Sequence, residues 1–483
     1  MSLPPPQPAR LPVPLKLFHG LGSIAYGVKD NGFSTFLLLF YNQVVGISAG
    51  IVGTAIMVAL IADAFADPII GELSDRTRSR WGRRLPWLYG APIPLGLAWM
   101  ALWNPPAMSE PMTVAWLIGF AIIVRTLVSM CEVPSIALVP ELTADYHERT
   151  LLVRYRFLFG WGGGLAMLAL AYAVFFGGPR GLTDPAGYFG YALTGAVMMA
   201  GAVMLSAAGQ HRRIARPSPP RAEMAAGLRA IAKEMTRTLS NRAFLWLVAA
   251  TLFAFINQGI TFALTNYLLG FFWQLSQGEM IGYVVMLFAS MVAAFLIVAP
   301  LSARMGKRNG AIVAGVFSLG FNSIIYLAWL GDIFPGLPGK PSVPSLFTLV
   351  FLSNSMAICL MILSSSMMAD VVEASQQETG RRSEGLFFAG YFFMQKMATG
   401  VGIFIAGQIL SLAAFPAATR PGQVSGTVLG NLATGYVIAV FVIGIVGLLI
   451  LRHFPISRSD HDARLKLLDD TAQLDVDAGG AHP

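Results

Sequence analysis

The chain has 483 residues, of which 55% are hydrophobic and only 12% are charged. Soluble globular proteins carry about 25% charged residues, so this composition excludes a protein whose surface faces mainly water. Twelve spans of about 20 residues with short loops would use most of the length and exclude a large soluble domain. The two cysteines, Cys131 and Cys359, lie inside apolar runs, which argues against a disulfide framework.

Apolar runs separated by charged or Pro/Gly-rich segments predict an all-α membrane protein with twelve transmembrane helices. In chain order, the predicted spans cover residues 17–46, 49–75, 85–104, 111–140, 152–177, 186–207, 242–271, 279–302, 309–331, 343–371, 384–413 and 427–451.

Basic residues are concentrated in alternate loops, which predicts the orientation of the chain. The basic loops contain Arg76, Arg78, Arg80, Arg83, Arg84, Arg149, Arg154, Arg212, Arg213, Arg216, Arg221, Arg229, Lys233, Arg237, Arg304, Lys307, Arg308, Arg381 and Arg382. The other loops contain only Arg180, Lys340 and Arg420. Because Lys and Arg favour the cytoplasmic side, we expect both termini to be cytoplasmic. The net charge of +8 is then mainly a topology signal, and no nucleic-acid partner is expected.

A faint internal repeat predicts two six-helix halves. GELSDRTRSRWGRR follows the second span and PLSARMGKRNG follows the eighth, the equivalent position in a second half. We expect an N-terminal half over 1–208, a cytoplasmic linker with an amphipathic helix over 209–241, a C-terminal half over 242–455 and a disordered tail over 456–483. This is the layout of the major facilitator superfamily, whose halves enclose a substrate site near the membrane midplane.

Ionisable side chains inside the predicted spans are costly and mark candidate functional sites. They are Asp30, Asp63, Asp67, Arg125, Glu132, Arg156 and Lys396. An ion-pair network that merely locks helices together is the structural alternative. Arg125 in particular would pair with Glu132 on its own helix or with a partner elsewhere. Two polar residues of the seventh span, Asn257 and Gln258, would either face the cavity or bond neighbouring helices.

Among these charged residues, Asp63 and Asp67 give the clearest indication of a functional site. Their spacing of four residues places them on one helix face, where two buried carboxylates repel each other. A bound proton or Na⁺ would relieve both the repulsion and the cost of burial. Ser129 could add a hydroxyl oxygen, which suits a hard cation. We therefore predict a coupling-cation site for H⁺ or Na⁺, with Asp63 and Asp67 as the metal ligands if the ion is Na⁺.

The segment IADAFADPIIGELSDRTRSRWGRRLPW (61–87) resembles the glycoside–pentoside–hexuronide:cation symporter family, which includes the melibiose permease. The resemblance extends over CEVPSIALVPEL (131–142), ERTLLVRYRF (148–157), MMADVVEASQQETGRRSEG (367–385) and MQKMATGVG (394–402). It implies a symporter in a bacterial-type inner membrane, monomeric and without a cofactor, that takes up a sugar or glycoside by alternating access.

The resemblance also implies roles for individual residues. Asp63, Asp67 and Ser129 match the cation site of the family, and Lys396 matches a lysine beside it. Asp30 and Glu132 match carboxylates that bind sugar hydroxyls. With the other polar candidates, the predicted substrate-binding residues are Asp30, Glu132, Arg156, Lys396, Arg125, Asn257 and Gln258.

Three departures keep a second substrate class open. Ala66 stands where the sugar permease has an asparagine that favours Na⁺, and Ile136 and Met361 stand where it has aromatic residues that stack on sugar. A lysophospholipid or another amphipathic metabolite is therefore the alternative substrate. The sequence contains no HExxH or GxSxG motif, so we do not expect an enzyme.

Overall fold

The computed structural model describes residues 11–143, 145–178, 181–215, 241–331, 343–379 and 384–455, and every secondary-structure element in these ranges is helical. The expected tail at 456–483 lies outside the described residues, and so does most of the expected linker, because α10 continues to Ile214 and the description resumes at Asn241. The boundaries of the two halves therefore stay a prediction.

The N-terminal helices follow the first six predicted spans. They are α1 (Val13–Leu21), α2 (Ile24–Asn31), η1 (Gly32–Phe36), α3 (Leu37–Leu39), η2 (Phe40–Val44), α4 (Ala49–Arg76), α5 (Leu85–Gly90), α6 (Pro92–Leu102), α7 (Glu110–Ala137), α8 (Val139–Leu142), α9 (Tyr146–Leu170), η3 (Ala171–Phe175), η4 (Gly181–Thr183) and α10 (Pro185–Ile214). The first span is interrupted twice by π-helical turns, η1 and η2. Such turns are rare and are frequent at functional sites.

The C-terminal helices follow the remaining six spans. They are α12 (Arg242–Tyr267), η5 (Leu268–Phe272), α13 (Gln277–Leu330), α14 (Val343–Thr379), α15 (Glu384–Leu412) and α16 (Gly426–Leu451). Within α13, Gly306 has a φ of 75°, a left-handed conformation that favours glycine, and it joins two helices across a kink. The two parts match the predicted spans 279–302 and 309–331.

The prediction of an all-α membrane protein is confirmed. In the described ranges, nine helices are long and apolar enough to cross a membrane, and the kinked α13 counts as one of them. The first and third predicted spans are covered by consecutive shorter helices. All twelve predicted ranges are thus helical over most of their length.

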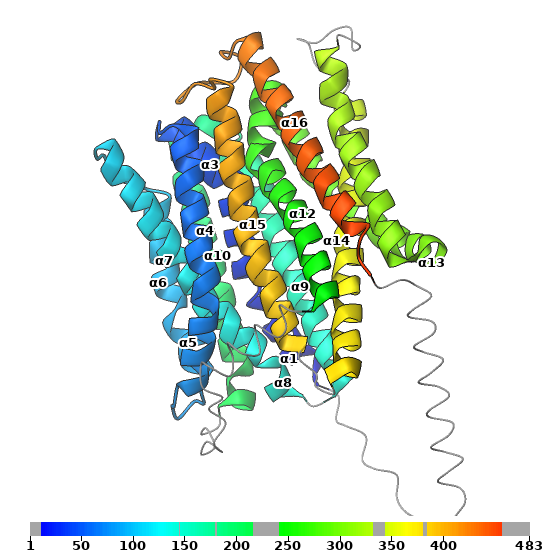
Figure 1. Cartoon of the computed structure of the whole chain (residues 1–483). Coiled ribbons are helices and arrows are strands. Elements are labelled where there is room, and N and C mark those ends of the chain that lie inside the picture. The colour runs from blue at the N-terminus through cyan, green and yellow to red at the C-terminus, as the bar shows by residue number, and fades with distance from the viewer. Residues whose placement is uncertain are drawn as a thin grey trace, which may run out of the picture.

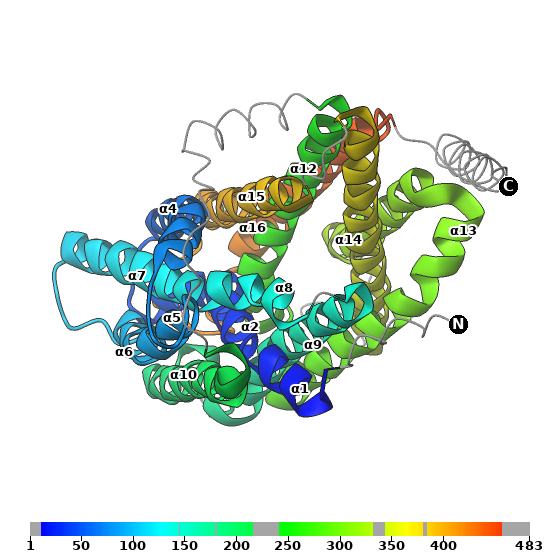
Figure 2. The ribbon, with the colours of Figure 1, turned by 90° about the horizontal axis from the view of Figure 1, so that it is seen from below.

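The helices run side by side between two ends of the molecule (Figure 1). We call one the basic end, because α4 finishes there at Arg76 and α10 finishes there with Arg212 and Arg213. The other, where α4 begins at Ala49, is the opposite end. Seen from the basic end, α4 lies directly beside α15, so that the two halves meet along this pair (Figure 2).

Glycines allow α4 and α15 to approach closely toward the opposite end. A Cβ on Gly53 would lie 3.2 Å from the Cα of Gly407, and a Cβ on Gly407 would lie 2.5 Å from the carbonyl oxygen of Ala49. The amide of Gly50 donates to the Ser411 hydroxyl at 3.0 Å. Small residues at such a contact let helix backbones pack without intervening side chains.

Buried polar groups also join the halves at the opposite end. Asn266 on α12 donates to the carbonyl of Thr35 at 2.9 Å and accepts from the Tyr172 hydroxyl at 2.7 Å, and it is fully buried. The Gln43 amide donates to the carbonyl of Pro416 at 2.9 Å. The halves are therefore hydrogen-bonded together at this end.

Candidate functional site

Asp63 is the centre of a buried ion-pair cluster. Its side chain is 2% exposed, and its Oδ2 accepts from Nε and Nη2 of Arg125 at 3.0 and 2.7 Å. The Ser129 hydroxyl donates to Oδ1 at 3.1 Å, and Nζ of Lys396 lies 3.0 Å from Oδ2. The sequence left two partners open for Arg125, and the structure pairs it with Asp63 on α4.

Lys396 extends this cluster across the boundary between the halves. Its Nζ donates to Oδ2 of Asp67 at 2.6 Å while it also contacts Asp63. The Oδ1 atom of Asp67 is buried and has no hydrogen-bond partner among the described residues, although the side chain as a whole is 31% exposed. One lysine of α15 therefore bridges the two carboxylates of α4 and offsets their repulsion.

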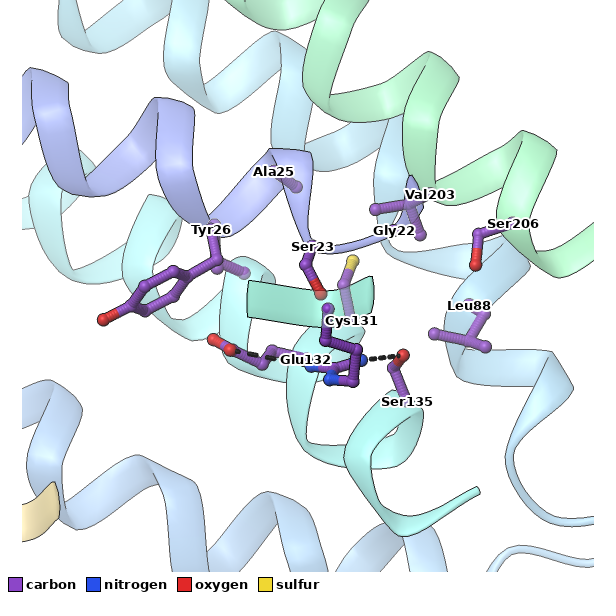
Figure 3. Close-up of a pocket in the computed structure, with 12 residues that line it drawn as sticks. Gly22, Ser23, Ala25, Tyr26, Leu88, Cys131, Glu132, Ser135, Val203 and Ser206 are labelled. Atoms are coloured by element: carbon purple, nitrogen blue, oxygen red, sulfur yellow. Dashed lines mark hydrogen bonds and ion pairs between the residues drawn. The ribbon is translucent and has the colours of Figure 1, made fainter. Parts of the chain in front are cut away.

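Glu132 and Arg156 form a second charged group, nearer the basic end. The Arg156 guanidinium donates to the Ser135 hydroxyl at 2.6 Å and lies 3.8 Å from Oε1 of Glu132, as the dashed lines of Figure 3 mark. Tyr26 and Ser23 line the same small cavity of about 10 Å³, which has room for roughly one water molecule. Glu132 is 25% exposed, so its carboxylate can reach a ligand.

Lys29 is a site residue that sequence reasoning missed. It lies on α2 with only 3% of its side chain exposed, 3.8 Å from Asp30 and 4.4 Å from the ring centre of Tyr26. The signal was available, because Lys29 is an ionisable residue within a predicted span, the same rule that selected its neighbour. Asp30 is 46% exposed and is the most accessible of the interior acids.

The seventh-span candidates stand apart from these charges. The amide nitrogen of Asn257 donates to the carbonyl of Val440 on α16 at 2.9 Å, so this side chain bonds two helices of the same half. Gln258 is its half-buried neighbour on α12. Their predicted contact with substrate remains a prediction, and the structure gives Asn257 a packing role.

The basic loop after α4 forms its own network within the N-terminal half. Arg84 is paired with Asp75 and donates to the Ser74 hydroxyl at 2.7 Å. Arg83 donates to Glu141 at 2.7 Å, which ties the loop after α4 to α8. These charges stabilise the basic end of one half and lie outside the clusters around Asp63 and Glu132.

The interior clusters differ in what they can bind. Asp63 is almost fully enclosed by its partners, whereas Asp30, Asp67 and Glu132 keep 46%, 31% and 25% of their side chains exposed. Accessible carboxylates accept hydrogen bonds from hydroxyl groups. The arrangement can therefore bind a polar, hydroxyl-rich molecule between charged side chains.

Comparison with known proteins agrees with this architecture. A family model described as MFS/sugar transport protein matches residues 18–458. The putative glycoside/cation symporter YagG of Escherichia coli is 26% identical, with 86% of each chain covered. The isoprimeverose transporter of Lactiplantibacillus pentosus is 27% identical over 83% of this chain and 80% of that protein.

A solved structure shares the fold at low sequence identity. The xylose transporter XylE from E. coli, in an inward open conformation, superposes with a TM-score of 0.59 at 16% identity, over 92% of this chain and 96% of that chain. This likeness shows the fold, and the family match with the named relatives makes the protein a multi-pass membrane transporter rather than an enzyme. The chain belongs to the MFS/sugar transport protein family, within the major facilitator superfamily.

Proposed function

We propose that the protein is a secondary active symporter that couples H⁺ or Na⁺ to the uptake of a sugar or glycoside by alternating access. The observation that carries the proposal is the pair Asp63 and Asp67, bridged by Lys396 from the other half. A cation that binds these carboxylates competes with Lys396, so cation binding is linked to the contact between the halves. The relatives named for glycosides and isoprimeverose support this substrate class.

The proposed substrate site uses the accessible acids and their basic neighbours. Asp30 and Glu132 accept hydrogen bonds from sugar hydroxyls, and Arg156, 3.8 Å from Glu132, holds that carboxylate in place. We further propose that the chain lies in a bacterial-type inner membrane as a monomer, with the basic end and both termini cytoplasmic.

The test is concentrative uptake of radiolabelled glycosides into vesicles under an imposed pH or Na⁺ gradient. The Asp67→Asn variant is expected to lose accumulation while it still exchanges substrate at equilibrium, because it binds substrate without the coupling ion. Glu72→Gln is the matched control, since Glu72 lies on the same helix in an exposed pair with Arg76. Gradient-driven accumulation by Asp67→Asn would contradict the proposed cation site.

A ligand screen separates the two substrate classes. Ile136, one helical turn after Glu132, is 52% exposed and gives the site an apolar neighbour. The purified protein is therefore heated with a panel of glycosides and, in parallel, with lysophospholipids. Stabilisation by glycosides supports the proposal, whereas stabilisation by lysophospholipids alone would move the assignment to an amphipathic substrate.

A further inference from the structure

The Oδ2 atom of Asp63 has no acceptor position left for a metal ion. A carboxylate offers about four acceptor positions. On Asp63, Nε and Nη2 of Arg125 and Nζ of Lys396 all lie within 3.0 Å of Oδ2, which has two lone pairs, while Oδ1 accepts from the Ser129 hydroxyl. A Na⁺ ion on Oδ2 would have to displace a cation that already contacts this atom.

Arg125 is the partner that stays with Asp63 throughout a transport cycle. α4 and α7 pack against each other within the N-terminal half, so the Arg125–Asp63 contact lies inside one half. Lys396 belongs to α15 in the other half. Alternating access is largely a rigid-body movement of one half against the other, so it separates contacts between halves and preserves contacts within them.

The Arg125 guanidinium is also fixed on its other face. Its carbon lies 5.1 Å from the ring centre of Phe33, and the side chain is 4% exposed. Leaving this site would take the charge away from both the carboxylate and the aromatic ring into an apolar interior, which is strongly unfavourable. A freely diffusing Na⁺ does not readily compete with a cation that is covalently part of the chain.

The geometry points to Arg125 as the residue that excludes Na⁺ from the acid pair of α4. Its guanidinium is a cation that is covalently part of the chain and lies where a dissolved ion would bind. With two acids (Asp63, Asp67) and two bases (Arg125, Lys396), the cluster is already neutral. This inference rests on the proposed function, which named H⁺ or Na⁺ as the coupling ion. It assigns H⁺.

Removing the tethered charge should create the Na⁺ site that the wild-type chain lacks. In Arg125→Ala the cluster carries one net negative charge, and the Asp63, Asp67 and Ser129 oxygens become available to a hard cation. Arg125→Lys is the matched control, because it keeps the positive charge at the same position. Arg125→Met removes the charge and preserves most of the side-chain volume.

The experiment measures the melting temperature of the purified full-length chain in NaCl and in KCl at equal ionic strength, without substrate. We expect the same Tm in both salts for the wild type and for Arg125→Lys. For Arg125→Ala and Arg125→Met we expect a Tm higher in NaCl by at least about 2 °C, because a ligand that binds only the folded state stabilises it. A variant that folds only in NaCl counts as the same result.

Two outcomes would overturn the inference: a Na⁺-specific rise in Tm for the wild type, or equal Tm values in both salts for both neutral variants. The first outcome is measured on the wild-type protein and needs no variant. Because the measurement needs no substrate, it is independent of the proposed function, which fails instead if the wild type neither accumulates nor binds any sugar. A purely structural role for Arg125 would lower the Tm of its variants equally in NaCl and KCl.

Discussion

Replacing Asn266 by alanine is expected to favour opening of the molecule at the opposite end. Asn266 makes two hydrogen bonds across the boundary between the halves, to the Thr35 carbonyl and from the Tyr172 hydroxyl, and is fully buried. Each such bond contributes about 0.5–1.5 kcal/mol, and a buried group left without its partner costs about 1–3 kcal/mol. A net shift of roughly 2–3 kcal/mol corresponds to about a 30- to 150-fold change in the population ratio.

Thiol labelling can measure this shift. The native cysteines, Cys131 and Cys359, are both buried, so the background reaction should be low. A cysteine at Thr35, which is 8% exposed, reports opening and leaves the carbonyl bond to Asn266 in place. The labelling rate with a hydrophilic maleimide should rise at least about tenfold in Asn266→Ala, since the open population limits the reaction.

The control is another asparagine whose bond lies within one half. Asn322 donates to the Tyr436 hydroxyl at 2.8 Å, and both residues belong to the C-terminal half. Asn322→Ala should therefore lower stability without changing the labelling rate at Thr35→Cys. The reasoning is refuted if Asn266→Ala leaves the rate unchanged, or if both asparagine variants raise it equally.

Two further substitutions test other contacts of the structure. Gly407→Leu should slow substrate exchange by at least about tenfold, because its Cβ would lie 2.5 Å from the Ala49 carbonyl and force α15 away from α4; an exchange rate equal to wild type would count against this close contact. Arg156→Lys should raise the apparent Km for substrate about tenfold with little loss of Tm. A lysine ammonium lacks the planar, two-pronged geometry with which the guanidinium contacts both the Ser135 hydroxyl and Glu132. An unchanged Km, measured by uptake at several substrate concentrations, would separate Arg156 from the substrate site.

The sequence predicted the helices better than it predicted their mutual contacts. All twelve ranges that hydropathy predicted are helical over most of their described length, since a span needs a long apolar stretch whatever it packs against, and nine helices in the described residues are long enough to cross a membrane. The same uniform apolarity hides which face of a span meets which neighbour. The sequence therefore left two possible partners for Arg125, and only the packing of α4 against α7 identifies Asp63 as its partner. Likewise, the sequence did not distinguish an Asn257 that faces a cavity from one that bonds α16.

The interior acids were predictable because their cost in a membrane makes each one conspicuous. The spacing of Asp63 and Asp67 indicated a shared face, and the structure places Lys396 from the other half between them. What the spacing could not indicate is how fully Asp63 is enclosed, since that depends on the depth and rotation of three helices. Lys29 shows the opposite case: the signal was present in the sequence, and the structure shows how deeply the residue is buried.

The balance of interior charges has an electrical consequence. Among the described residues, the candidate site contains eight charged side chains: Asp30, Asp63, Asp67, Glu132, Lys29, Arg125, Arg156 and Lys396. Four are acidic and four are basic, so in their standard ionisation states they sum to zero. In the proposed cycle these side chains of the empty carrier thus move no net charge through the membrane field, and the membrane potential does no work on them during its return. A neutral substrate with one monovalent cation adds a single charge, worth about 2.3 kcal/mol per 100 mV, so voltage would act on the loaded step alone.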